Sequence, residues 1–121
     1  MVRILAYWVT TVLVVAELAL GGVWDLLRLP YVRGIVEHVG YPVYFLTILG
    51  TWKVAGAVVL LLPRVPLVKE WAYAGTFFVF TGAVASHLFI GDGPGYWGQP
   101  LAVAALAVAS WALRPPSRRL H

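Results

Sequence analysis

Residues 4–24 read ILAYWVTTVLVVAELALGGVW, and Glu17 is the only charged side chain among them. A helix needs about 20 such residues to cross the ~30 Å hydrocarbon core of a bilayer. Because lipid offers the backbone no hydrogen-bond partner, a run of this kind has to be helical. We therefore predict a transmembrane helix over residues 4–24.

Three further apolar runs of similar length follow, at residues 43–62, 71–90 and 97–113. The joints between them contain turn residues, with Pro63 and Pro66 after one run and the glycine-rich segment 91–95 after the next. The sequence therefore predicts an all-α protein, a transmembrane four-helix bundle that forms a single membrane domain over residues 1–121.

The composition excludes most soluble classes of protein. Hydrophobic residues make up 61% of the 121 residues and charged residues 12%, and the mean hydropathy is +0.84. A soluble domain carries about a quarter charged residues, and a chain this short has too little interior to hide the apolar excess. A soluble enzyme, a nucleic-acid-binding protein and a disordered tail all fit poorly. The absence of cysteine also excludes disulfides and thiolate metal sites.

The basic residues predict the orientation, because they lie between the apolar runs. One side of a four-span chain would collect Arg3, Arg64, Lys69, Arg114, Arg118 and Arg119, and the other only Arg28 and Arg33. An excess of lysine and arginine marks the cytoplasmic side, so we expect a protein of the cytoplasmic membrane with both termini in the cytoplasm. The alternative, a cleaved signal peptide at the start, is disfavoured by the length of the first run and by Glu17 within it.

Residues 30–39 predict a short amphipathic helix between the first two spans. It would start at Pro30, and Arg33 and Glu37 would form an opposite-charge pair on its polar side. Its apolar side chains recur with the spacing of one helical face, at Val32, Ile35, Val36 and Val39. Such a helix lies in the membrane interface. It would either simply close the loop or act as a lid over an opening between the spans.

Three polar residues interrupt the spans: Glu17, Lys53 and His87. A charge near the centre of a membrane helix costs about 2.5–3.5 kcal/mol, so each should face the other helices, and all three could meet in the outer half of the membrane. One hypothesis is a structural ion pair with a hydrogen-bonded histidine that fixes helix packing. The other is a small polar pocket that binds the head of an apolar ligand or relays a proton.

Nothing in the spacing of these residues favours catalysis. Glu17 and His87 could supply a base and its partner, but no catalytic motif surrounds them. We therefore predict no catalytic residues, and the few histidines lack the spacing of a metal site.

The chain resembles the DoxX-like family of small membrane proteins in segments that run from about residue 7 to residue 113. The matching features are Gly40-Tyr41-Pro42, Gly50 with Lys53 and Gly56, Leu60–Pro63, Lys69–Gly75, Gly82-Ala83 and His87. The resemblance implies a four-helix membrane bundle, and the family's namesake is a subunit associated with quinone-linked sulfur oxidation. Relatives tend to have a basic residue after the paired glycines of the first span, where this chain has Trp24 and Asp25.

The expected function is that of a non-catalytic subunit or a lipid- or quinone-binding module, with Glu17, Lys53 and His87 as the candidate binding residues. A quinone is the candidate cofactor. The expected partners are the lipid bilayer and either another membrane subunit or a second copy of the chain, without nucleic acid. Two alternatives stay open: a quinone-linked membrane oxidoreductase component and an oligomeric small-solute or proton-coupled carrier.

Overall fold

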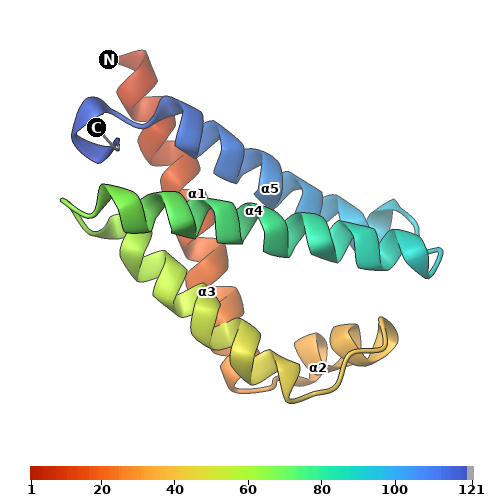
Figure 1. The fold of residues 1–121 in the computed structure, drawn as a ribbon. Helices are drawn as coiled ribbons and strands as arrows, with labels where there is room; N and C mark the ends of the chain where they lie inside the picture. The colour runs from red at the N-terminus through yellow and green to blue at the C-terminus, as the bar shows by residue number, and fades with distance from the viewer. Residues whose placement is uncertain (120–121) are drawn as a thin grey trace.

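The computed structural model describes residues 1–119, and this part of the chain is helical without strands (Figure 1). Its five α-helices are α1 (Val2–Leu26), α2 (Pro30–His38), α3 (Phe45–Leu61), α4 (Pro66–Phe89) and α5 (Pro94–Leu113), followed by a 3-10 turn at Pro116–Arg118. A helix therefore occupies each of the five segments in which the sequence predicts one.

Proline and glycine set the helix boundaries. Pro30, Pro66 and Pro94 each stand in the first turn of a helix, where the missing N–H costs nothing. Gly40 and Gly91 follow the ends of α2 and α4 with φ of 90° and 81°, a backbone conformation that glycine adopts without strain. These residues explain why the turns between the helices are short.

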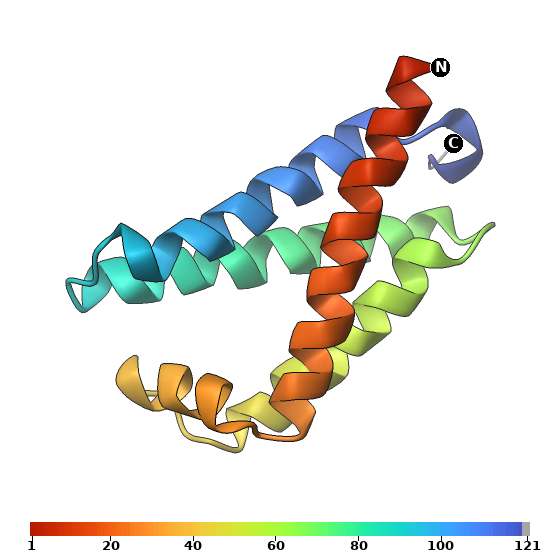
Figure 2. The same cartoon turned by 180° about the vertical axis from the view of Figure 1, so that it is seen from behind.

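The longer helices form two crossed pairs. α1 packs on α3 and α5, and α4 packs on α5 and α3. In Figures 1 and 2 the pair α1 and α3 lies close to the pair α4 and α5 near the end that carries both termini. Towards the other end the two pairs diverge, and α2 lies across that side. This arrangement bears out the all-α fold but does not confirm the four-helix bundle that the sequence predicts.

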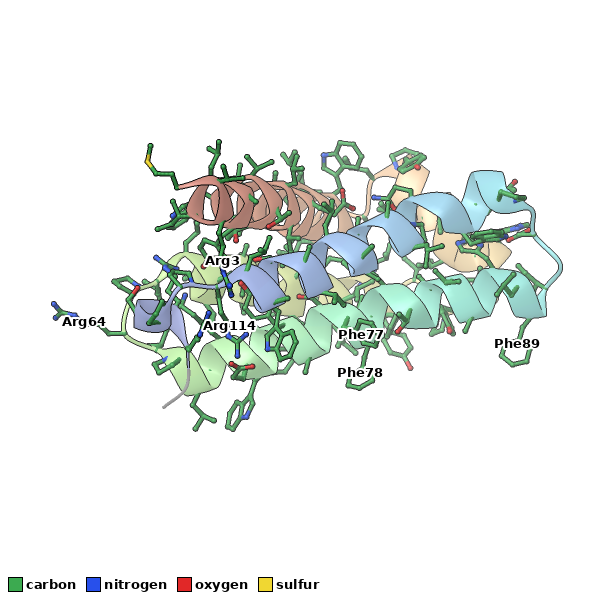
Figure 3. The ribbon with its side chains drawn as sticks, turned by 90° about the horizontal axis from the view of Figure 1, so that it is seen from above. Arg3, Arg64, Phe77, Phe78, Phe89 and Arg114 are labelled. Atoms are coloured by element: carbon green, nitrogen blue, oxygen red, sulfur yellow. The ribbon has the colours of Figure 1, made fainter. Side chains whose placement is uncertain are left out.

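The distribution of side chains is unlike that of a soluble core. Apolar residues from the four longer helices form the buried cluster, at Val14, Leu18, Ala57, Leu60, Tyr73, Phe80, Val103, Ala104 and Ala107. Polar side chains are buried as well, at Thr11, Asp25, Lys69, Thr76, His87 and Ser110. Large apolar side chains meanwhile point outward, as Figure 3 shows for Phe77, Phe78 and Phe89 of α4. So much exposed apolar surface indicates an apolar environment around the helices.

Two helices of the described chain are long and apolar enough to cross a membrane, α1 and α4. Only 28% and 22% of their most apolar segments are buried, whereas the core helix of a soluble protein would be mostly buried. α3 is apolar too but has 17 residues.

Candidate functional site

Two glycines let α1 and α3 approach backbone to backbone. A Cβ atom on Gly50 would lie 2.7 Å from the carbonyl oxygen of Gly22, and one on Gly22 would lie 3.1 Å from the carbonyl oxygen of Gly50. Both distances are shorter than an ordinary van der Waals contact, so neither position has room for a side chain. Asp25 follows Gly22 by one turn of α1, and Lys53 follows Gly50 by one turn of α3. The close contact of the two helices brings these side chains within reach of each other.

Lys53 forms a buried ion pair with Asp25. Its Nζ lies 3.1 Å from Oδ2 of Asp25, and the two side chains are 13% and 3% exposed. This oxygen has no well-aligned hydrogen bond among residues 1–119, so the attraction is mainly between charges. The ammonium also lies 5.4 Å from the ring centroid of Phe80 on α4, a cation–π distance. The pair therefore links α1, α3 and α4.

Glu17 lies near the same ammonium without pairing with it. A Cβ atom on Gly21 would be 3.5 Å from Nζ of Lys53 and 3.6 Å from Oε1 of Glu17, so the two groups flank that glycine. In the described residues the ion pair of Lys53 is with Asp25. Glu17 and Lys53 are thus close together, as the sequence led us to expect, but the carboxylate paired with Lys53 is that of Asp25, which was not among the predicted site residues.

A pattern in the sequence could have found Asp25. Glu17, Gly21 and Asp25 follow one another at intervals of one helical turn and therefore share a face of α1. The predicted span ended at Trp24 and left Asp25 in a loop, whereas α1 continues to Leu26. The long lysine side chain then reaches along α3 towards this last turn.

An apolar groove opens between α3 and α4 beside Lys53. Its volume is about 420 Å³, within the range typical of small-molecule sites. The lining comes from α3 and α4, with Leu18 from α1, and Lys53 is the charged residue among these side chains. Trp52 and Trp71 line the groove and are largely exposed. The arrangement suits a ligand with an apolar body and a polar head that accepts a hydrogen bond.

His87 belongs to a second polar cluster, near α2. Its Nδ1 donates to Oδ2 of Asp92 at 2.7 Å, and Nε2 of His38 donates to the same carboxylate at 2.8 and 2.9 Å. The ring of Tyr96 stacks on His38 at 5.1 Å between centroids. Of the three predicted site residues, the structure thus brings Glu17 and Lys53 together and gives His87 other partners.

The second cluster ties α2 to the opposite helix pair. α2 is joined through its loops to α1 and α3, and His38 connects it to Asp92 in the turn between α4 and α5. After α2, the hydroxyl of Tyr41 also lies 2.7 Å from that of Ser86 on α4. Because the helix pairs diverge on this side (Figure 2), α2 bridges them.

We expect this bridge to loosen in acid. Partial desolvation raises the pKa of Asp92, but the hydrogen bonds from His87 and then His38 outweigh it and lower the pKa below its usual value. A lowered carboxyl pKa means that its stabilising effect is present above about pH 4 and is lost as the pH falls through the pKa of the folded state. Each histidine nitrogen that donates in the neutral ring also donates in the charged ring. The protonation of Asp92 therefore decides when the bridge opens.

Spin labels on Gly34→Cys in α2 and Gly93→Cys before α5 would measure this opening, since the chain has no other cysteine and a Cβ at either position meets no atom within 4 Å. The distance between the labels should lengthen as the pH falls below about 4, and Asp92→Ala should lengthen it at neutral pH. Glu37→Gln is the control: it removes a carboxylate that lies on α2 itself, and it should leave the distance between the labels unchanged. A distance that stays constant through the acid range would contradict the bridge.

Within residues 1–119 no group of three histidine, cysteine, aspartate or glutamate side chains could hold a metal ion.

Hydroxyl groups form a third buried polar cluster, where α1, α4 and α5 meet. Oγ of Ser110 lies 2.6 Å from Oγ1 of Thr11 and 2.8 Å from the hydroxyl of Tyr73. These bonds fasten the end of the fold that carries the termini.

Comparison with known proteins gives a family. Neither the curated proteins nor the solved structures contain a match to the chain. The sequence pattern of the DoxX-like family matches residues 9–110, which include four of the five α-helices nearly whole. The matched range also includes the polar residues around Lys53 and those around Asp92. The chain therefore belongs to the DoxX-like family, and it is a small membrane protein.

Proposed function

We propose that the chain is a single four-span domain of the cytoplasmic membrane, with α1, α3, α4 and α5 crossing the bilayer and both termini in the cytoplasm. The family, the length of α1 and α4 and the outward apolar side chains support this placement. α3 has 17 residues and so a length of about 26 Å, which a bilayer accommodates by thinning slightly. The cations gathered at the end with the termini favour that end as the cytoplasmic one.

Within this domain we infer a site for a lipid or a quinone in the groove between α3 and α4. The observation that carries the inference is the apolar groove of about 420 Å³ with Lys53 in its lining. The tail of the ligand would lie between Trp52 and Trp71, and its head would accept a hydrogen bond from Nζ of Lys53. Asp25 supports this role because its carboxylate, 3.1 Å from Nζ of Lys53, holds the ammonium group in position.

The function that follows is to hold or present this ligand, without catalysis, alone or as the subunit of a larger membrane assembly. Lys53, and not Glu17 or His87, would contact the ligand directly, since it is the one of the three that lines the groove. Glu17 would tune the local charge. His87 would act at a distance, because it shares Asp92 with His38 and so helps to hold α2 against the turn between α4 and α5.

Filling the groove tests the proposal. A Cβ on Gly75 or on Gly82 meets no atom within 4 Å, and both residues lie on α4, but only Gly75 lines the groove. We expect Gly75→Leu to weaken binding of a short-chain benzoquinone by about tenfold or more, which corresponds to about 1.4 kcal/mol. Gly82→Leu should bind like the unchanged protein. Quenching of tryptophan fluorescence would measure binding, because Trp52 and Trp71 line the groove.

Native mass spectrometry after gentle extraction should find a lipid or quinone of defined mass on the protein, and less of it on Gly75→Leu. Equal loss in both leucine variants would contradict the groove as the site. An empty protein that leaves the membrane only with a second polypeptide would favour a purely structural subunit. Quinone reduction by the purified protein would favour the oxidoreductase alternative, and solute flux into proteoliposomes the carrier.

A further inference from the structure

The end of the molecule that carries both termini has a large excess of positive charge. The cations there are Arg3, Arg64, Lys69, Arg114, Arg118 and Arg119. Figure 3 shows Arg3 and Arg114 at this end and Arg64 pointing away from it. The nearby carboxylate of Glu70 is occupied, since it lies 3.0 Å from Arg114 and accepts a hydrogen bond from Trp111.

Part of this charge has a structural role, because helix ends with free carbonyl oxygens attract cations. Lys69 donates to the carbonyl oxygens of Val59 and Leu60 at 2.6 and 2.9 Å and thereby caps α3. Arg118 donates to the same oxygen of Leu60 at 3.0 Å. Two cations therefore cap the end of α3, and this cap explains why Lys69 is there.

Arg3 and Arg119 are much less engaged. Arg3 makes one hydrogen bond, of 3.2 Å, to the carbonyl oxygen of Ala112, and Arg119 makes one, of 2.8 Å, from Nε to the carbonyl oxygen of Arg114. A guanidinium group has five N–H donors. Most donors of these two arginines thus have no acceptor within residues 1–119, and the nearby carboxylate of Glu70 is already paired with Arg114.

An apolar surface adjoins Arg118, the neighbour of Arg119 in the chain. Arg118 lies over the ring of Trp8, 4.7 Å from its centroid, and Trp8 is partly exposed. Leu5, Val9 and Val12 continue the exposed apolar surface along α1. Tryptophan side chains are typical of the headgroup level of a membrane, and bidentate arginine is the usual partner of phosphate. A cation stacked on an interfacial tryptophan next to an apolar helix face matches a phospholipid better than a soluble anion.

We propose that Arg3 and Arg119, with Arg118 stacked on Trp8, bind the phosphate of an anionic phospholipid whose acyl chains lie along α1. This site rests on the membrane placement proposed above but not on the groove, which lies between α3 and α4. Gly75→Leu should therefore leave phospholipid binding at α1 unchanged. The two proposals can thus fail separately.

Binding of phosphatidylglycerol and phosphatidylcholine to the purified full chain, measured by native mass spectrometry, tests the site. We expect phosphatidylglycerol to bind more tightly, and Arg3→Gln combined with Arg119→Gln to weaken it by about tenfold or more. Arg28→Gln with Arg33→Gln removes the same charge from the opposite end and should preserve the preference. Equal losses in the two double variants, or no loss in the first, would overturn the proposal.

Two further arms use the folded protein without removing its charge. Raising the salt concentration should weaken phosphatidylglycerol binding more than phosphatidylcholine binding, because exposed charges are screened. Arg3→Lys with Arg119→Lys keeps the charge and should retain most of the binding. Inorganic phosphate that displaces phosphatidylglycerol completely at millimolar concentration would identify a soluble anion as the ligand and overturn the lipid assignment.

Discussion

Replacing Lys53 by methionine is expected to destabilise the folded protein by about 3–5 kcal/mol, because the change leaves a buried carboxylate without its cation. Asp25 is 3% exposed, and Lys53 is its ion-pair partner. Asp25→Asn combined with Lys53→Met removes both charges and should recover most of the loss. Unfolding in detergent, followed by circular dichroism, would give the free energy of each variant.

The same measurements show which carboxylate forms the ion pair with Lys53. Because the structure pairs Lys53 with Asp25, the coupling energy should be larger in the cycle with Asp25→Asn than in the cycle with Glu17→Gln. Simple additivity of Asp25→Asn and Lys53→Met would mean that the pair does not stabilise the fold. A larger coupling energy with Glu17 would contradict the pairing with Asp25 and favour the ion pair between Glu17 and Lys53 that the sequence suggests.

Gly50→Ala is expected to push α1 and α3 apart. The added methyl group would lie 2.7 Å from the carbonyl oxygen of Gly22 and 2.9 Å from the backbone nitrogen of Leu26. Overpacking of this kind costs about 1–3 kcal/mol or more. We expect a value at the upper end, because the methyl group would meet backbone atoms of α1, which cannot move aside as a side chain can. Gly22→Ala meets Val54 Cγ2 at 2.8 Å and should destabilise the fold less, because a side chain can move.

Matched controls exist on α4. Gly75→Ala and Gly82→Ala add the same methyl group where no atom lies within 4 Å. Alanine in the middle of a helix is about 1 kcal/mol better than glycine, so both controls should keep or raise the stability. Thermal unfolding in detergent compares the four variants directly. Similar midpoints for Gly50→Ala and Gly75→Ala would show that the helices do not need their close approach.

The positions of the helices could be predicted from the sequence because lipid forces every long apolar run to satisfy its own backbone hydrogen bonds. The boundaries were less accurate wherever polar residues belong to a helix. α4 begins at Pro66 instead of residue 71, and Lys69 is buried in its first turn, where it donates to the end of α3. α1 likewise runs past Trp24 and includes Asp25. Hydropathy marks the apolar segment of a helix, not its ends.

The candidate residues could be recognised but not assigned to their partners. Glu17, Lys53 and His87 stand out because each is a polar residue in an apolar run, and a polar group there has to find a partner. For Lys53 the partner depends on how α1 and α3 pack, which brings it to Asp25. His87 instead bonds Asp92, five residues further along the chain, and the position of α2 adds His38 to the same carboxylate.

That the chain is helical and apolar could be read from the sequence alone, because both properties depend on composition and on the period of short segments. Its membership of the DoxX-like family follows from the match over residues 9–110. Three further features depend on how the helices pack: Gly22 faces Gly50, Asp25 pairs with Lys53, and α2 bridges two diverging helix pairs. The reason is physical: each of these contacts joins segments that are separate in the chain, and a shift of one helical turn would replace every partner.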